Sequence, residues 1–203
     1  MKLYYLPGAC SLADHIALAW TGAPYEAEEV PRDQLKSPAF LAKNPAGSVP
    51  VLEDGHFVLT ENIAILNYIA ELHPGAHLNG DDSPQGRAEV NRWLGFLNSD
   101  VHKGFAPIFG PGKFTDDENQ HEPLKAKARE RLSELFGRID QRLAASPWLA
   151  GAQRSVADAY LFVVWRWARA KQVNLGGYDH LAAFAQRMTD DPGVQQAMRE
   201  EGL

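Results

Sequence analysis

The chain has one cysteine, Cys10, within "YYLPGACSLADH" (residues 4–15), between a Pro-Gly break and an amphipathic stretch. A helix that begins near Ser11 would leave unpaired N–H groups and its dipole beside the sulfur, which lowers a thiol pKa. The pattern therefore predicts a nucleophilic thiol. A buried structural cysteine explains the position equally well, and Ser11 is also typical of a simple N-cap. Ala13 occupies the second cysteine position of a C-x-x-C motif, which excludes a dithiol cycle within one chain.

Two other stretches could bind a small peptide-like molecule. Val49-Pro50 lies at the start of an apolar hairpin, where a cis bond would turn the Val49 backbone outward, although a trans bond is the statistical default. Thr60-Glu61-Asn62 begins a predicted helix, whose first N–H groups could receive a carboxylate. Ordinary capping by Thr60, with an acidic residue in the first turn, is the alternative.

His102 is a candidate proton acceptor within "SDVHKGFAP" (99–107). On a helix it shares one face with Asn91, Gly95 and Asn98, since these residues are spaced three or four apart. A neutral histidine on this face could take up a proton near a sulfur. A solvated surface histidine is the alternative that the residues alone leave open.

These residues are distributed over elements that the hydrophobic spacing predicts. In the N-terminal part, strands alternate with amphipathic helices, and Gly22 is a plausible helix stop. Asp54-Gly55 indicates a hairpin turn, and Pro74-Gly75 ends the last helix of this part. The predicted elements are strand 2–6, helix 12–20, strand 25–30, short helix 37–44, hairpin 48–60 and helix 61–73.

The composition changes at "HLNGDDSPQG" (77–86), after which no strand is predicted. Ser83-Pro84 is typical of an N-cap followed by the first helical residue. Ser155 and Asp158 form a capping-box pattern with a structural role. We expect an α/β domain over 1–77, a linker over 78–83 and an all-helical domain over 84–203. Its predicted helices begin at 84 and then cover about 122–145, 155–171 and 179–190, with a short one after Pro192 and a loop at 109–121.

Composition excludes several classes of function. The 203 residues carry a net charge of −6, and the 20 Lys and Arg are scattered, so a nucleic acid is not an expected partner. The apolar runs are too short for a membrane helix, and the early Pro7-Gly8 break argues against a signal peptide, so we expect a cytoplasmic protein. No nucleotide-binding motif is present. Pro74-Gly75 separates His73 from His77, so no metal site is expected.

Four stretches together, "YYLPGACSLADHIAL", "NPAGSVPVLEDG", "LTENIAILNYIAE" and "SVADAYLF", resemble the bacterial beta class of glutathione S-transferases. The resemblance covers nearly the whole chain, in the order of the two predicted domains. It implies a thioredoxin-like N-terminal domain and an all-α C-terminal domain, with glutathione as cosubstrate between them and no metal or nucleotide. It also implies a homodimer with a small hydrophobic electrophile as second substrate.

The resemblance further implies roles for the residues of the N-terminal domain. Cys10 would meet the glutathione sulfur, with Ser11 beside it as a second catalytic residue. Val49, before a cis-Pro50, would bind the cysteinyl part of glutathione through its backbone. The γ-glutamyl end would meet Glu61 and Asn62, although many members have Ser or Gly where this chain has Asn62. Lys36 and Arg32 are both candidates to bind the glycyl carboxylate.

In the C-terminal domain the resemblance makes His102 the active-site histidine. The helix that carries it would lie near a two-fold axis, so that Asn98 or His102 comes close to the partner's glutathione. A polar residue common one turn earlier has become Gly95 here, which removes a possible contact. Trp167 lines the site or packs in the core.

The expected activity is glutathione transfer to small hydrophobic electrophiles, or thiol–disulfide exchange through Cys10, with dehalogenation equally open. A non-catalytic carrier of hydrophobic ligands with the same fold is the alternative. The presence of Cys10 favours chemistry, because carriage needs no thiolate. The sequence does not distinguish among the catalysed reactions.

Overall fold

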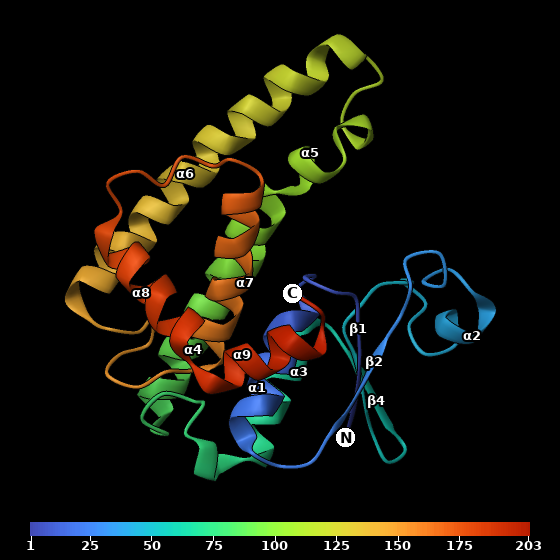
Figure 1. Ribbon diagram of the computed structural model, residues 1–203, viewed down its shortest axis with the longest axis vertical. Coiled ribbons are helices and arrows are strands. Elements are labelled where there is room, and N and C mark those ends of the chain that lie inside the picture. Colours follow the sequence, from blue (N-terminus) through green and yellow to red (C-terminus); the bar gives the residue numbers. More distant parts are fainter.

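The computed structural model describes residues 1–203, and its N-terminal part contains one four-stranded mixed sheet (Figure 1). The strand order is β2-β1-β3-β4, with β1 parallel to β2 and antiparallel to β3. β2 is an edge strand whose four residues, Glu-Ala-Glu-Glu, are all exposed, and charges there discourage pairing with another chain. The strands are β1 (Lys2–Tyr5), β2 (Glu26–Glu29), β3 (Val51–Asp54) and β4 (Phe57–Thr60).

The helices of this part cover both faces of the sheet. α1 (Ser11–Thr21) and α3 (Asn62–Leu72) pack together on the face toward the helical domain. α2 (Pro38–Leu41) lies on the opposite face, where Phe40 packs with Tyr4, Val30 and Val51. η1 (Pro74–Ala76), a 3₁₀ turn, follows α3. The predicted helix stop is confirmed, since Gly22 follows α1 with φ 67°, a left-handed conformation that glycine adopts without a side-chain clash.

The hairpin is confirmed with a shift of one residue. Its turn was predicted at Asp54-Gly55, whereas the structure pairs Asp54 with Phe57 and places Gly55 and His56 in the loop. Gly55 has φ 59°, so the glycine takes the first central position of the turn. The correction matters little for the site, because β3 still begins at Val51, directly after Pro50.

The C-terminal part is helical, as predicted. Helices α4 and α8 pack against a central helix, α7. The predicted capping box of α7, at Ser155 and Asp158, is confirmed. A π-helical segment, a widened turn that is common at functional sites, follows α4 and carries Asn98 and His102. The elements are α4 (Pro84–Phe96), η2 (Leu97–His102), α5 (Ala106–Phe109), η3 (Pro111–Lys113), η4 (Glu118–Gln120), α6 (His121–Ala145), α7 (Val156–Ala170), α8 (Asp179–Asp190) and α9 (Pro192–Glu200).

One hydrophobic core joins the two parts of the chain. α1 packs against α7 and α9, so a helix of the N-terminal part is covered by two from the C-terminal part. Figure 1 shows α9 and the C-terminus beside α1, near the end of β1. The boundary at residues 78–83 stays a prediction. That segment joins η1 to α4, and the buried Leu78 accepts a hydrogen bond from Val156 N through its carbonyl.

The structure has neither a helix suited to a membrane nor a cluster of side chains suited to a metal. None of its helices combines the length and apolar character that crossing a lipid bilayer requires. No three His, Cys, Asp or Glu side chains are grouped so that they could hold a metal ion. His77 instead contacts Asp82, with 2.8 Å between Nδ1 and Oδ2.

Candidate active site

Cys10 directly precedes α1, as the sequence predicted. The helix begins at Ser11, and no side chain caps its first turn. The Cys10 side chain is partly exposed, and its thiol donates a hydrogen bond to Val49 O at 3.7 Å. The Val49-Pro50 peptide bond is cis, which confirms the second expectation about this loop. The start of α1 and the loop before β3 therefore meet at the sulfur.

The low thiol pKa that the sequence predicted is wrong for the unliganded protein. Burial raises the pKa of the Cys10 thiol to about 12, and the charge of Asp14, one turn later, raises it further. The backbone N–H of Ser11 opposes this rise but does not overcome it. A helix N-terminus alone contributes about 0.3–1 kcal/mol, less than the desolvation of a thiolate costs. Cys10 is thus a neutral hydrogen-bond donor at neutral pH.

Ser11 does not have the catalytic place expected for it. Its side chain is fully buried, and its hydroxyl accepts from Leu6 N at 3.3 Å and donates to Leu6 O at 3.5 Å. A hydroxyl engaged with the backbone beneath the helix cannot reach a substrate. We assign Ser11 a positioning role, since it fixes the loop that carries Cys10.

Lys36 lies beside the loop that leads to Val49 and Pro50, which the sequence alone did not predict. Its ammonium group donates to Ala46 O at 2.7 Å. Gly47 has φ 58°, and a Cβ there would come within 2.7 Å of Lys36 Nζ. No hydrogen bond or ion pair holds the exposed Arg32 near this loop. Of the two basic candidates, Lys36 is the one beside the backbone that precedes Val49.

The start of α3 is open, as an anion-binding helix terminus would be. Glu61 is the N-cap residue, makes no side-chain capping bond and has φ 73°, an unfavourable value for a residue with a side chain. Capping by Thr60, the alternative raised from the sequence, is therefore wrong. The first N–H groups of α3 are unpaired within the helix. Glu61 is exposed, and its charge is close enough to raise the pKa of Cys10 slightly.

The side chain of Asn62 points into the protein and not toward the solvent-exposed start of α3. Its side chain is only 7% exposed, and its amide nitrogen faces Cys10 O at 3.2 Å and Asp14 Oδ2 at 2.8 Å, in the orientation that pairs donors with acceptors. The side-chain contact with glutathione that the resemblance implied for Asn62 is thus absent from this arrangement. Only its backbone N–H remains available to a ligand.

The hydroxyl of Tyr160, on α7, joins the two candidate residues of η2. It lies 2.6 Å from His102 Nδ1 and donates to Asn98 Oδ1 at 3.2 Å. Because the hydroxyl donates to Asn98, we assign the proton of the neutral His102 ring to Nδ1, which leaves Nε2 unprotonated. Burial lowers the pKa of His102, so the ring is neutral at pH 7. Asn98 therefore binds Tyr160 in this chain.

Sequence reasoning overlooked Tyr160. Its side chain is fully buried, and burial raises the pKa of its hydroxyl. A signal was present, because a tyrosine inside the apolar run of α7 needs a partner for its hydroxyl. The run was instead interpreted only as a folding motif.

Aromatic rings continue the site on the side of His102. Trp167 lies 4.8 Å from His102 between ring centroids, and Phe109 lies 5.4 Å from Trp167. Phe105 is buried beneath them, whereas Phe109 is 50% exposed. Trp167 also donates from Nε1 to Gly8 O at 2.8 Å, two residues before Cys10. Trp167 is therefore part of the site and does more than pack in the core.

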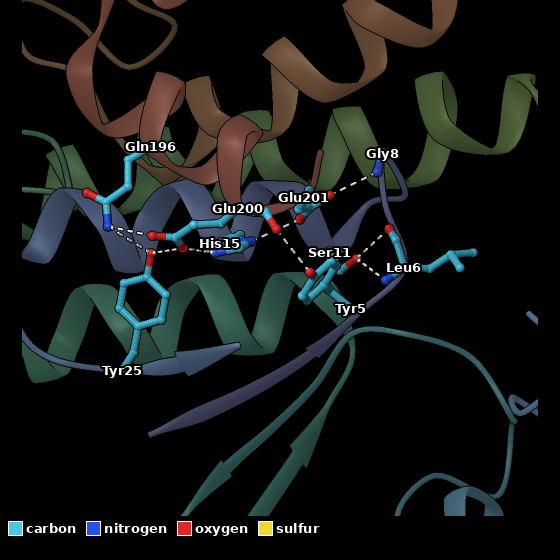
Figure 2. Close-up of polar contacts among 9 residues, drawn as sticks. All are labelled: Tyr5, Leu6, Gly8, Ser11, His15, Tyr25, Gln196, Glu200 and Glu201. Carbon is cyan, nitrogen blue, oxygen red and sulfur yellow. Dashed lines mark hydrogen bonds and ion pairs between the residues drawn. The ribbon is translucent and has the colours of Figure 1, made fainter. Parts of the chain in front are cut away.

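The C-terminus holds the same loop from the other side (Figure 2). Glu201, whose side chain is fully buried, accepts from Gly8 N at 2.9 Å and lies 3.0 Å from His15 Nδ1. His15 Nε2 lies 2.7 Å from Glu200, and Glu200 also accepts from the Tyr25 hydroxyl at 2.9 Å. The last residues of the chain thus position the loop that precedes the thiol.

This fold and this arrangement around a thiol agree with the comparisons to known proteins. Residues 1–71 match the glutathione S-transferase N-terminal domain model, and residues 97–192 match the C-terminal one. A glutathione S-transferase of Xanthomonas campestris is 47% identical over the whole of both chains. The chain therefore belongs to the glutathione S-transferase family. This confirms the predicted fold class, a thioredoxin-like domain followed by an all-α domain.

Solved structures agree with this assignment. A glutathione S-transferase from Xylella fastidiosa superimposes with a TM-score of 0.97 at 47% identity, over 100% of this chain and 98% of the other. A bacterial beta-class enzyme from Sphingomonas chungbukensis gives 0.88 at 40% identity, with both chains covered completely. The resemblance to bacterial beta-class glutathione S-transferases is confirmed, and the protein is a glutathione transferase.

Proposed function

We propose that the main reaction is conjugation of glutathione to small hydrophobic electrophiles, with Cys10 as a hydrogen-bond donor to the glutathione sulfur. The observation that carries this proposal is the place of the Cys10 thiol, which lies at the start of α1 and donates to Val49 O at 3.7 Å. Burial also raises the pKa of this thiol to about 12, so it keeps its proton. When two thiols lie together, the one with the lower pKa loses its proton first. A free thiol has a pKa of ~8.5, so the glutathione sulfur becomes the nucleophile and Cys10 keeps its proton.

In this reaction the glutathione thiolate forms a bond to carbon as the leaving group departs with its electron pair. The proton of the glutathione thiol passes to a base, for which we assign the unprotonated Nε2 of His102. Thiol–disulfide exchange requires a Cys10 thiolate instead, which burial and the charge of Asp14 oppose. A thiol that keeps its proton thus favours conjugation over exchange.

Glutathione would lie between the loop before β3 and the start of α3. Val49 would bind its cysteinyl part, Glu61 and the first N–H groups of α3 its γ-glutamyl end, and Lys36 its glycyl carboxylate. The open N-terminus of α3 supports this placement, since backbone N–H groups and the dipole attract a carboxylate. The aromatic group of Trp167 and Phe109 would hold the electrophile.

Glutathione-affinity retention tests this placement. Glu61→Ala should lose more retention than Lys36→Ala, because Lys36 already has a partner in Ala46 O. Arg32→Ala, the matched basic control, should be retained like the wild type. Equal losses in Glu61→Ala and Arg32→Ala would contradict the placement.

Two substitutions at the thiol separate the two reactions. Cys10→Ser retains a donor and should keep conjugation of a chlorinated dinitrobenzene within about tenfold of the wild type, whereas Cys10→Ala should lose more. We expect the wild type to reduce hydroxyethyl disulfide only slowly. Neither variant should abolish this minor activity, whereas an enzyme that works by thiol–disulfide exchange through Cys10 would lose it in both. Full loss of conjugation in Cys10→Ser would contradict the donor role, because the serine hydroxyl can also donate a hydrogen bond.

A homodimer and a cytoplasmic location remain predictions from the family resemblance and the single cysteine. Light scattering at micromolar concentration tests the first. A species of only 22.4 kDa, the mass of one chain, would contradict it.

A further inference from the structure

Asp14 is a fully buried acid that the proposed reaction does not use. It lies on α1, one turn after Cys10, and none of its side chain is exposed. Its Oδ1 atom has no hydrogen-bond partner. Burial raises the pKa of this carboxyl well above its ordinary value, and the charge of Glu201 adds to the rise. No cation stabilises it, so burying this carboxyl with only one of its oxygens bonded is costly to the fold.

Asn62 is the partner that Asp14 does have. The amide group of Asn62 carries two N–H donors, and one faces Asp14 Oδ2 at 2.8 Å while the other faces Cys10 O at 3.2 Å. The first residue of α3 is therefore tied to α1 at two points. One tie ends at the cysteine backbone and the other at the buried acid.

We propose that Asp14 is a positioning residue of the glutathione site, which keeps the Asn62 amide turned inward so that the first turn of α3 presents only its backbone N–H groups to the γ-glutamyl carboxylate. The inference rests on the proposed placement of glutathione. The buried Asn62 amide needs acceptors inside the protein, and Asp14 supplies one of them.

The physical reason lies in the backbone that Asn62 controls. Glu61, the preceding residue, has φ 73°, a conformation that persists only when its surroundings fix it. The two hydrogen bonds of the Asn62 amide fix the residue that directly follows Glu61, and so help to hold the Glu61 backbone in this conformation. Without Asp14 the amide keeps one acceptor, Cys10 O, and can rotate toward the ligand. The α3 terminus and the Cys10 backbone would then no longer be held together.

The test measures the glutathione dissociation constant by quenching of tryptophan fluorescence, together with KM and kcat for a chlorinated dinitrobenzene. The variants are Asp14→Ala, Asp14→Asn, Asn62→Ala and the double variant Asp14→Ala with Asn62→Ala. Asp14→Asn retains an acceptor oxygen and is the conservative control. Thermal melting of each variant reports folding separately.

We expect Asp14→Ala to weaken glutathione binding about tenfold, with KM for glutathione raised and kcat changed less. Asp14→Asn should restore binding to within about twofold of the wild type. In the Asn62→Ala background, Asp14→Ala should weaken binding no further, because the interaction is already absent. If Asp14→Ala does not fold, Asn62→Ala alone must show the same weakening.

Three outcomes would overturn the proposal. The first is unchanged binding in both Asp14→Ala and Asn62→Ala. The second is an equal loss from Asp14→Ala with and without Asn62. The third is a lower melting temperature with no change in the dissociation constant, which would make the pair merely structural. Failure of the wild type to bind glutathione would instead refute the proposed function, so the two failures are distinguishable.

Discussion

The backbone N–H of Gly8 donates to the carboxylate of Glu201 at 2.9 Å, so the third residue from the end of the chain holds the loop that leads to Cys10. Trp167 binds the carbonyl of the same glycine at 2.8 Å. The backbone N–H and the carbonyl of Gly8 are thus both hydrogen-bonded to side chains of the C-terminal part of the chain. The thiol site of the N-terminal domain consequently depends on the C-terminal domain for its geometry.

Glu201→Ala should destabilise the protein by about 3 kcal/mol, or roughly 10 °C in melting temperature. The substitution leaves Gly8 N and the buried His15 Nδ1 without their acceptor. Glu200→Ala is the matched control, because its carboxylate is 40% exposed and water can replace it. Calorimetric melting of both variants makes the comparison, and equal losses would show that the Gly8 contact contributes nothing.

Cys10 should react slowly with iodoacetamide, because only the thiolate attacks and burial raises the thiol pKa to about 12. At pH 8 we expect a rate at least about tenfold below that of free cysteine, whose pKa is ~8.5. The rate should still be rising at pH 10. Asp14→Asn removes a negative charge that raises the thiol pKa, and should speed the reaction.

Intact mass measured against time and pH follows this alkylation, and Cys10→Ala gives the blank. A rate that reaches a plateau with its midpoint below pH 8 would mean that the thiolate is stabilised. The helix N-terminus would then outweigh burial.

His102 should remain neutral to lower pH than an ordinary histidine. Burial lowers its pKa, so the ring gains its proton only as the pH falls through a value below ~6.5. NMR titration of the ring protons measures this midpoint. Tyr160→Phe removes the partner of Nδ1 and should lower kcat about tenfold, which corresponds to roughly 1.4 kcal/mol. A midpoint above 6.5, or an unchanged kcat in Tyr160→Phe, would remove His102 from its assigned role.

Phe109→Ala should raise KM for an apolar electrophile about fivefold and leave KM for glutathione unchanged. Phe109 is 50% exposed beside Trp167, so a bound apolar ligand would cover it, and full burial of such a ring contributes about 1.5–3 kcal/mol. Phe114→Ala, which replaces a similarly exposed ring, is the matched control. An equal change in the two variants would place the electrophile elsewhere.

Much of the fold was encoded locally and could be predicted from the sequence. The starts of α2 and α4 follow from their capping serines and prolines, and the end of α1 follows from Gly22, since these preferences act within a few residues. The charged strand Glu26–Glu29 was the weakest prediction, because pairing with β1 rather than its own composition makes it a strand. The positions of Cys10 and the cis Pro50 followed from motif and resemblance.

Only the tertiary structure decided the protonation state of Cys10 and the directions in which the side chains of Ser11 and Asn62 point. The sequence placed Cys10 at a helix N-terminus, but its high pKa depends on burial and on Asp14, and burial is set by distant segments. Ser11 and Asn62 occupy the expected positions, yet their side chains point inward, to Leu6 in one case and to Asp14 in the other. Tyr160 and Glu201 reach the site from far along the chain. Local preferences fix elements, whereas desolvation and long-range hydrogen bonds exist only once those elements have packed.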